Sequence, residues 1–175
     1  MAPFRACSAA LGAALVVGLA GPVLAQGGGA QPKPVAQFGD WGVYTGQSGS
    51  SKVCYALAQP KERKPEGLNR DPAYFFVSTR PGEKVKDEVS ITVGFKMKDG
   101  SESKLTIGSQ TFQLYTKDEG AWVRNVAEEG KLVDAMRKGK DLTIASTSTR
   151  GNVTTDRYSL SGLGQALDRV VQECK

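Results

Sequence analysis

The sequence contains no histidine. Histidine is the commonest general base near neutral pH and the commonest metal ligand, so its absence excludes a Ser-His-Asp triad and histidine-ligated metal sites. Cysteine is scarce too, with Cys7 near the N-terminus and only Cys54 and Cys174 beyond it. If those two are paired, neither a thiolate nucleophile nor a cysteine-rich zinc site remains, and we expect no cofactor.

Long apolar runs are also lacking, apart from residues 11–24. With Arg5 before this run and Val23-Leu24-Ala25 at its end, the pattern predicts a signal peptide over residues 1–25 that is cleaved after Ala25. The alternative is a permanent anchor, but a span needs about 20 apolar residues and this run is shorter. We expect a flexible leader over residues 26–35, one folded domain over residues 36–175, and no membrane span after cleavage.

The charge balance is mildly basic, with a formal net charge of +5. No arginine-rich tract accompanies it, so nucleic acid is not expected as a partner. A basic, exported domain tolerates anionic partners such as an envelope surface, although a soluble surface with excess lysine explains the charge equally well.

An even number of cysteines in an exported chain favours a disulfide, here Cys54–Cys174, over two separate thiols. The spacing of apolar residues over 163–174 predicts a helix that Ser161 can cap. Cys174 falls on the apolar face of that helix, where it can reach a cysteine on a strand. A second helix is predicted over residues 127–138, with Gly139 as its stop signal.

Alternating apolar and polar side chains predict a strand over residues 85–97, with Lys98-Asp99-Gly100 as a hairpin turn into residues 105–107. Further strands are expected at the ranges 41–45, 52–58, 73–79, 110–116, 121–126, 142–148 and 153–160. The apolar run over residues 73–77 suggests a strand buried on both faces. Many short strands joined by close turns indicate an antiparallel β-sandwich or barrel.

Two features are candidates for binding. The first is a lysine set that we expect to share the outward face of the hairpin: Lys86, Lys96, Lys98 and Lys104. The second is the long stretch over residues 59–72, which carries Lys61, Arg63 and Lys64, because unusually long connections are often functional or mobile. The respective alternatives are gatekeeping charge on an exposed face and a disordered insertion.

Catalytic patterns are weak. The pairs Asp87-Glu88 and Glu128-Glu129 are neighbours in sequence, and neighbouring side chains point in different directions, so solvated charge is the simpler interpretation. The pattern from Ser101 to Lys104 matches S-x-x-K but follows a turn and has no companion motifs. A hydrolase based on carboxylates or on Ser and Lys remains the alternative function.

Several short motifs, in order, resemble one family. They are Phe38-Gly39-Asp40-Trp41, Cys54 in the next strand, Ser148-Thr149-Arg150-Gly151, Ser159-Leu160-Ser161-Gly162-Leu163 with Ala166, and the terminal Cys174. Together with the signal peptide, this set is similar to the invasion-associated locus B family of exported bacterial proteins.

The resemblance implies an immunoglobulin-like β-sandwich in the periplasm, with outer-membrane association or secretion as alternatives. It transfers no catalytic residues. The family name comes from a link to host-cell invasion, yet members also occur in non-invasive bacteria. We therefore expect a non-enzymatic envelope protein that binds an envelope component, an anionic envelope surface or a partner protein, with a host protein as the alternative partner.

Overall fold

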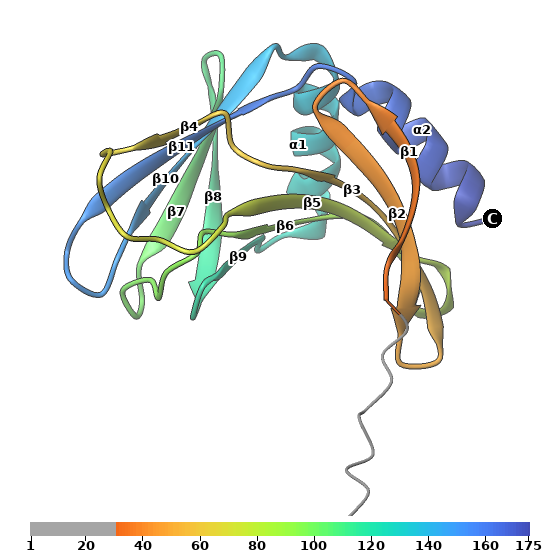
Figure 1. The fold of residues 1–175 in the computed structure, drawn as a ribbon, viewed down its shortest axis with the longest axis horizontal. Helices are drawn as coiled ribbons and strands as arrows, with labels where there is room; N and C mark the ends of the chain where they lie inside the picture. The colour runs from red at the N-terminus through yellow and green to blue at the C-terminus, as the bar shows by residue number, and fades with distance from the viewer. Residues whose placement is uncertain (1–30) are drawn as a thin grey trace, which may run out of the picture.

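The computed structural model describes residues 31–175 (Figure 1). The predicted signal peptide and leader residues 26–30 lie outside these described residues. In the described part, ordered structure begins earlier than the sequence indicates, because Lys33–Phe38 already forms a strand. No helix within residues 31–175 is both long and apolar enough to cross a membrane.

Strands dominate the described chain. They are β1 (Lys33–Phe38), β2 (Trp41–Ser48), β3 (Ser51–Ala58), β4 (Glu62–Lys64), β5 (Tyr74–Arg80), β6 (Val85–Thr92), β7 (Glu102–Ile107), β8 (Gln110–Lys117), β9 (Gly120–Val123), β10 (Asp141–Thr147) and β11 (Val153–Ser159). The helices are α1 (Val126–Lys138) and α2 (Leu163–Glu173), with a 3-10 turn at Pro81–Glu83.

The strands form one antiparallel sheet in the order β1-β2-β3-β5-β6-β9-β8-β7-β10-β11-β4. The sheet curves over on itself, so that the two halves enclose a core (Figure 1). Phe75 of β5 makes edge contacts with Trp41 of β2 and Tyr158 of β11, at 5.8 and 5.5 Å between ring centroids. The predicted fold class is therefore confirmed: a mainly β, antiparallel sandwich with two helices, the second C-terminal.

The predicted hairpin between residues 85–97 and 105–107 does not form. The strand ends at Thr92, and β9 and β8 lie between β6 and β7 in the sheet. Gly94 explains the break: it has φ +73°, and a Cβ there would overlap the carbonyl of Asp71. Phe95 and Met97 extend the alternating sequence pattern past Gly94, but in the structure they lie outside β6.

The stretch over residues 59–72 is not a disordered insertion. Residues 62–64 form β4, which pairs with β11 at one edge of the sheet. Pairing with β11 is a long-range contact, which explains why a three-residue strand has no local sequence signal.

Helix α2 packs on β1, β2, β3 and β5, and Cys174, the C-cap residue of the helix, forms the predicted disulfide with Cys54 of β3. Ser161 does not cap this helix. The N-cap is Gly162, at φ +89°, and the Ser161 carbonyl instead accepts a hydrogen bond from the Asp40 amide at 3.1 Å. Two of the family-like motifs thus contact each other, and Trp41 Nε1 donates to the Ser159 carbonyl at 3.0 Å. Their role here is structural.

Helix α1 matches its prediction and ends at Gly139. It packs on β6 and β9, and Glu129 Oε1 accepts a hydrogen bond of 2.6 Å from the Val89 amide. Burial, together with the charges of Glu88 and Asp87, raises the pKa of Glu129 above its ordinary value. Glu129 of one predicted carboxylate pair therefore lies near Glu88 and Asp87 of the other where α1 covers β6.

Glu129→Gln should separate the hydrogen bond from the charge, because glutamine keeps the accepting oxygen. A carboxyl whose pKa is raised by folding contributes stability at low pH that is lost as the pH rises above 4.5, the ordinary value. At neutral pH we expect E129Q to be more stable than E128Q by on the order of 0.5 kcal/mol, allowing for solvent screening. E128Q is the matched control, because both changes remove one negative charge from the first turn of α1. Urea unfolding at several pH values measures the difference, and an E129Q variant less stable than E128Q at neutral pH would contradict it.

Candidate functional site

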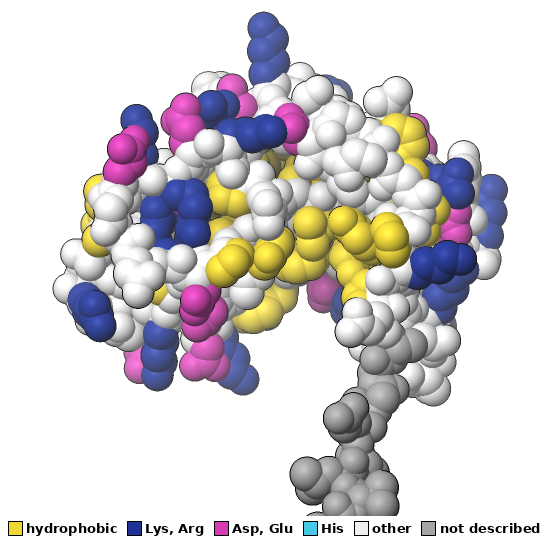
Figure 2. Space-filling view, viewed as in Figure 1, with side chains coloured by type: hydrophobic (Ala, Val, Ile, Leu, Met, Phe, Trp, Pro, Cys, Tyr) yellow, Lys and Arg dark blue, Asp and Glu magenta, His cyan; other side chains and the backbone are white. Residues whose placement is uncertain are grey.

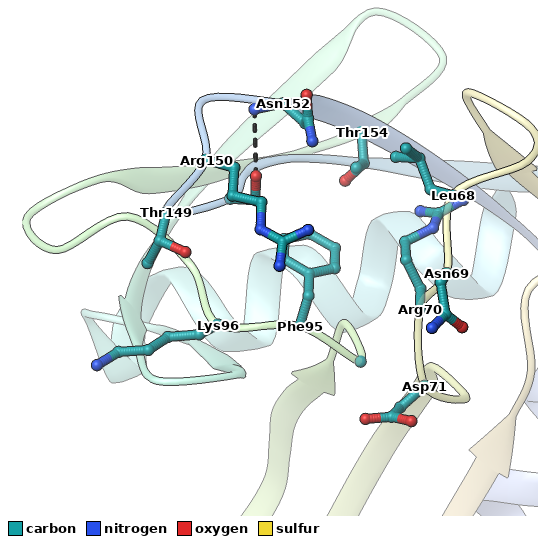
Figure 3. Close-up of a pocket in the computed structure, with 12 residues that line it drawn as sticks. Leu68, Asn69, Arg70, Asp71, Phe95, Lys96, Thr149, Arg150, Asn152 and Thr154 are labelled. Carbon is teal, nitrogen blue, oxygen red and sulfur yellow. Dashed lines mark hydrogen bonds between the residues drawn. The ribbon is translucent and has the colours of Figure 1, made fainter.

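A pocket of about 390 Å³ lies where three connections meet. One wall comes from Leu68, Asn69 and Arg70, in the connection between β4 and β5. The opposite wall comes from Phe95, which follows β6, and from Arg150, in the turn between β10 and β11 (Figure 3). Loops on a rigid sheet are common positions for binding residues, so this pocket is the best-formed candidate site.

A buried ion cluster supports the pocket from below. Asp156 of β11 accepts from Arg70 Nη1 at 2.9 Å and from Arg63 Nε at 3.3 Å, and only 4% of its side chain is exposed. Arg63 also donates to the carbonyls of Asp71 at 2.8 Å and Val93 at 2.9 Å. One side chain therefore ties β4 to the ends of two neighbouring connections, which fixes the wall that carries Leu68, Asn69 and Arg70.

Tyr158 lies beside this cluster in the core. Its side chain is buried, and its hydroxyl has no hydrogen-bond partner among the described residues. Burial, and then the negative charge of Asp156, raises the pKa of Tyr158 well above its ordinary value. The hydroxyl stays neutral and serves packing rather than acid–base chemistry.

The mouth of the pocket is cationic. Lys96 and Arg150 are exposed at its rim, and Arg150 forms no ion pair among residues 31–175. In Figure 3 Arg150 extends toward the cavity, whereas the ammonium group of Lys96 points away from it. Asn69, Asn152 and Thr154 add polar groups to the lining, and Asp71 adds a carboxylate at the edge away from Arg150 (Figure 3). This arrangement suits a small anionic group held by charge-assisted hydrogen bonds.

The seven basic residues predicted as a binding surface are dispersed. Lys96 lies at the rim of the pocket and Arg63 beneath it, whereas Lys61 pairs with Asp40. The remaining four are exposed at separate places: Lys64 in β4, Lys86 in β6, Lys98 in the turn before β7, and Lys104 in β7. Because the expected hairpin is absent, the lysine set does not share one hairpin face.

The pocket includes residues that the sequence interpretation did not assign to binding. Arg70 and Asn69 belong to the long stretch that was singled out, but their positions depend on Asp156. Arg150 and Thr149 belong to the motif Ser148-Thr149-Arg150-Gly151, which was noted only for its family resemblance. That motif was the one sequence signal that could have found the second wall.

The residues of the weak catalytic patterns make structural contacts. Glu88 is bound through both oxygens by Arg80, at 2.7 and 3.1 Å, and Glu129 holds a backbone amide. Lys104 is exposed on β7, whereas Ser101 precedes that strand and contacts Thr116. Ser101 is therefore held by Thr116, and no hydrogen bond joins it to Lys104 within residues 31–175.

Comparison with known proteins agrees with the order of the motifs. The family model described as invasion associated locus B (IalB) protein matches residues 41–171. Among solved structures, the crystal structure of invasion associated protein b from Bartonella henselae superposes with a TM-score of 0.55 at 18% identity, covering 82% of this chain and 97% of that one. No curated protein matches. The likeness to the solved structure shows a shared fold, and the family match over most of the chain shows that this protein belongs to the invasion associated locus B family.

Proposed function

We propose that this protein is a non-enzymatic, exported envelope protein that binds an anionic group of an envelope component or partner protein in the pocket between Arg70 and Arg150. The observation that carries the proposal is the cationic rim, in which Arg150 reaches over a preformed hollow while Asp156 holds Arg70 in the opposite wall. The predicted signal peptide supports a periplasmic location, and the family membership supports a role in the envelope.

A role at the host-cell surface is a second candidate, favoured by the solved relative, which is itself described as an invasion associated protein. It requires exposure on the outer surface of the cell. Protease accessibility in intact cells separates the two: digestion of this protein without lysis supports host contact, and full protection restricts it to the periplasm.

Arg150→Ala should weaken binding of pyrophosphate, used as a compact anionic probe, by about tenfold, because it removes a charge-assisted hydrogen bond at the rim. Isothermal titration calorimetry measures the affinity at low and moderate salt. Lys86→Ala is the matched control, since it removes one exposed positive charge from β6, outside the pocket. Absence of saturable binding to the wild type, or an equal loss in K86A, would overturn the pocket assignment.

A further inference from the structure

The sheet carries a second surface of unusual composition on the face opposite the core. Strand register places Phe76, Ser90, Trp122 and Tyr115 side by side across β5, β6, β9 and β8. We call the rings on this face the aromatic band: Tyr44, Tyr55, Tyr74, Phe76, Tyr115 and Trp122. Each is at least partly exposed, and Figure 2 shows hydrophobic side chains gathered along the hollowed side of the molecule.

This surface was hidden in the sequence by the run over residues 73–77, which we interpreted as a strand buried on both faces. In the structure β5 alternates: Phe75 and Val77 are buried in the core, whereas Tyr74 and Phe76 face outward and remain partly exposed. The outward residues of a β-sheet are ordinarily polar, so a row of rings here needs an explanation.

Two glycines allow rings of the band to lie against the sheet. A Cβ at Gly42 would come within 2.7 Å of the Tyr44 ring, and a Cβ at Gly120 would overlap the indole of Trp122. Neither glycine has a positive φ, so neither is required by backbone conformation. Their missing side chains instead leave room for Tyr44 and Trp122 to lie over the backbone, where both rings stay partly exposed.

The rings form two groups on either side of Ser90: Tyr44, Tyr55, Tyr74 and Phe76 are in contact on one side, and Tyr115 and Trp122 on the other. Tyr44 and Tyr55 are nearly parallel at 5.4 Å between centroids, and Tyr115 and Trp122 are nearly parallel at 5.6 Å. Between Phe76 and Trp122 lies an open hollow of about 500 Å³. Its polar lining consists of Ser90, Thr92, Lys117, Asp118 and Glu119.

We propose that the aromatic band binds a linear glycan of β-linked hexopyranoses. The flat face of such a sugar presents weakly positive C–H groups that suit the negative face of an aromatic ring, while its edge presents hydroxyls that suit Ser90, Thr92 and the carboxylates. Phe76 and Trp122 lie two strands apart, about 10 Å, which is close to the span of two linked pyranose rings.

The same features disfavour an apolar occupant. A lipid or an aliphatic peptide would leave the hydroxyl of Ser90 without a hydrogen-bond partner between two rings, and the carboxylates of Asp118 and Glu119 oppose an anionic membrane surface. The source of the glycan rests on the exported location proposed above, which brings the band to the cell-wall glycan. The binding chemistry itself is independent of the pocket at Arg150.

Intrinsic fluorescence gives a direct test, because the chain has two tryptophans and Trp41 is completely buried. Titration with chitohexaose, a soluble β-linked hexamer, should change the Trp122 emission saturably, and dextran, which is α-linked, should not. We expect Trp122→Ala to weaken retention on purified cell-wall glycan strands by tenfold or more. Gly120→Ala should also weaken retention, because the added methyl group displaces the Trp122 indole, and this variant keeps Trp122 as the fluorophore. Val153→Ser, at an exposed apolar residue of β11, is the control.

Circular dichroism confirms that each variant is folded, and Gly42→Ala at the other end of the band provides a second test if Trp122→Ala unfolds. Binding that is equal in W122A, G120A and V153S, or no binding of chitohexaose by the wild type, would overturn the proposal. Retention on phosphatidylglycerol vesicles that depends on Trp122 would overturn it in favour of lipid. Pyrophosphate binding at the pocket is measured on the same samples, so failure of the band is distinguishable from failure of the proposed function.

Discussion

Replacing Asp156 with asparagine is expected to lower the free energy of unfolding by about 3 kcal/mol, because removing one partner of a buried ion pair leaves uncompensated charge. Asp156 is the shared acceptor of Arg63 and Arg70, and 6% of the Arg70 side chain is exposed. Without the carboxylate, two guanidinium groups remain close together in a poorly solvated site. Asparagine keeps the size of the side chain, so the loss reports the charge rather than a cavity.

Glu62→Gln is the matched control for this change. It also removes a carboxylate from an arginine pair between β4 and β11, at 2.9 Å from Arg157, but that pair is exposed. Exposed pairs contribute little, so E62Q should unfold at nearly the same urea concentration as the wild type. A D156N variant within about 1 kcal/mol of E62Q would show that the cluster does not hold the edge of the sheet.

The same substitution links stability to the candidate site. Arg70 reaches Asp156 from the connection that forms one wall of the pocket, and Arg63 reaches it from β4, where that connection begins. We therefore expect amide hydrogen exchange in D156N to rise in residues 62–71 before it rises in the core strands, since local opening begins where few contacts remain.

Most helices and strands of the fold could be predicted from local sequence patterns. Alternation predicted β2, β3, β8, β10 and β11, and the Gly139 stop signal predicted the end of α1. These elements follow their local pattern because one face of each is buried and the other is solvated. The disulfide could be predicted for a different reason, since the two cysteines beyond the predicted signal peptide offer only one intramolecular pairing.

The candidate binding surfaces could not be predicted from the sequence, because contacts between distant residues determine them. Arg63 was predicted as part of a basic binding surface, yet it forms an ion pair with Asp156, which is far along the chain. Similarly, nothing local in residues 73–77 shows which side of β5 a helix or a second sheet half will cover. A short apolar run has the same sequence pattern whether its strand is buried on both faces or exposes aromatic rings on one of them.

Removing the disulfide by the double substitution Cys54→Ala and Cys174→Ala is expected to lower the free energy of unfolding by about 4 kcal/mol, since the bond closes a very long loop in the unfolded chain. The two cysteines are 120 positions apart. Alanine suits the site better than serine, because Cys54 is completely buried and a serine hydroxyl there would need a new hydrogen-bond partner.

The location of the loss distinguishes this effect from a general weakening of the core. Leu163, Ala166, Leu167 and Val170 bury α2 independently of the disulfide, so most of the helix should stay docked. Its last turn, where Lys52 donates to the Glu173 carbonyl beside Cys174, should exchange its amides faster. Urea unfolding with and without reductant provides the control: reductant should lower the stability of the wild type to that of the double variant and leave the variant unchanged. A wild type whose stability is insensitive to reductant, and in which both thiols are free, would show that the Cys54–Cys174 bond does not form.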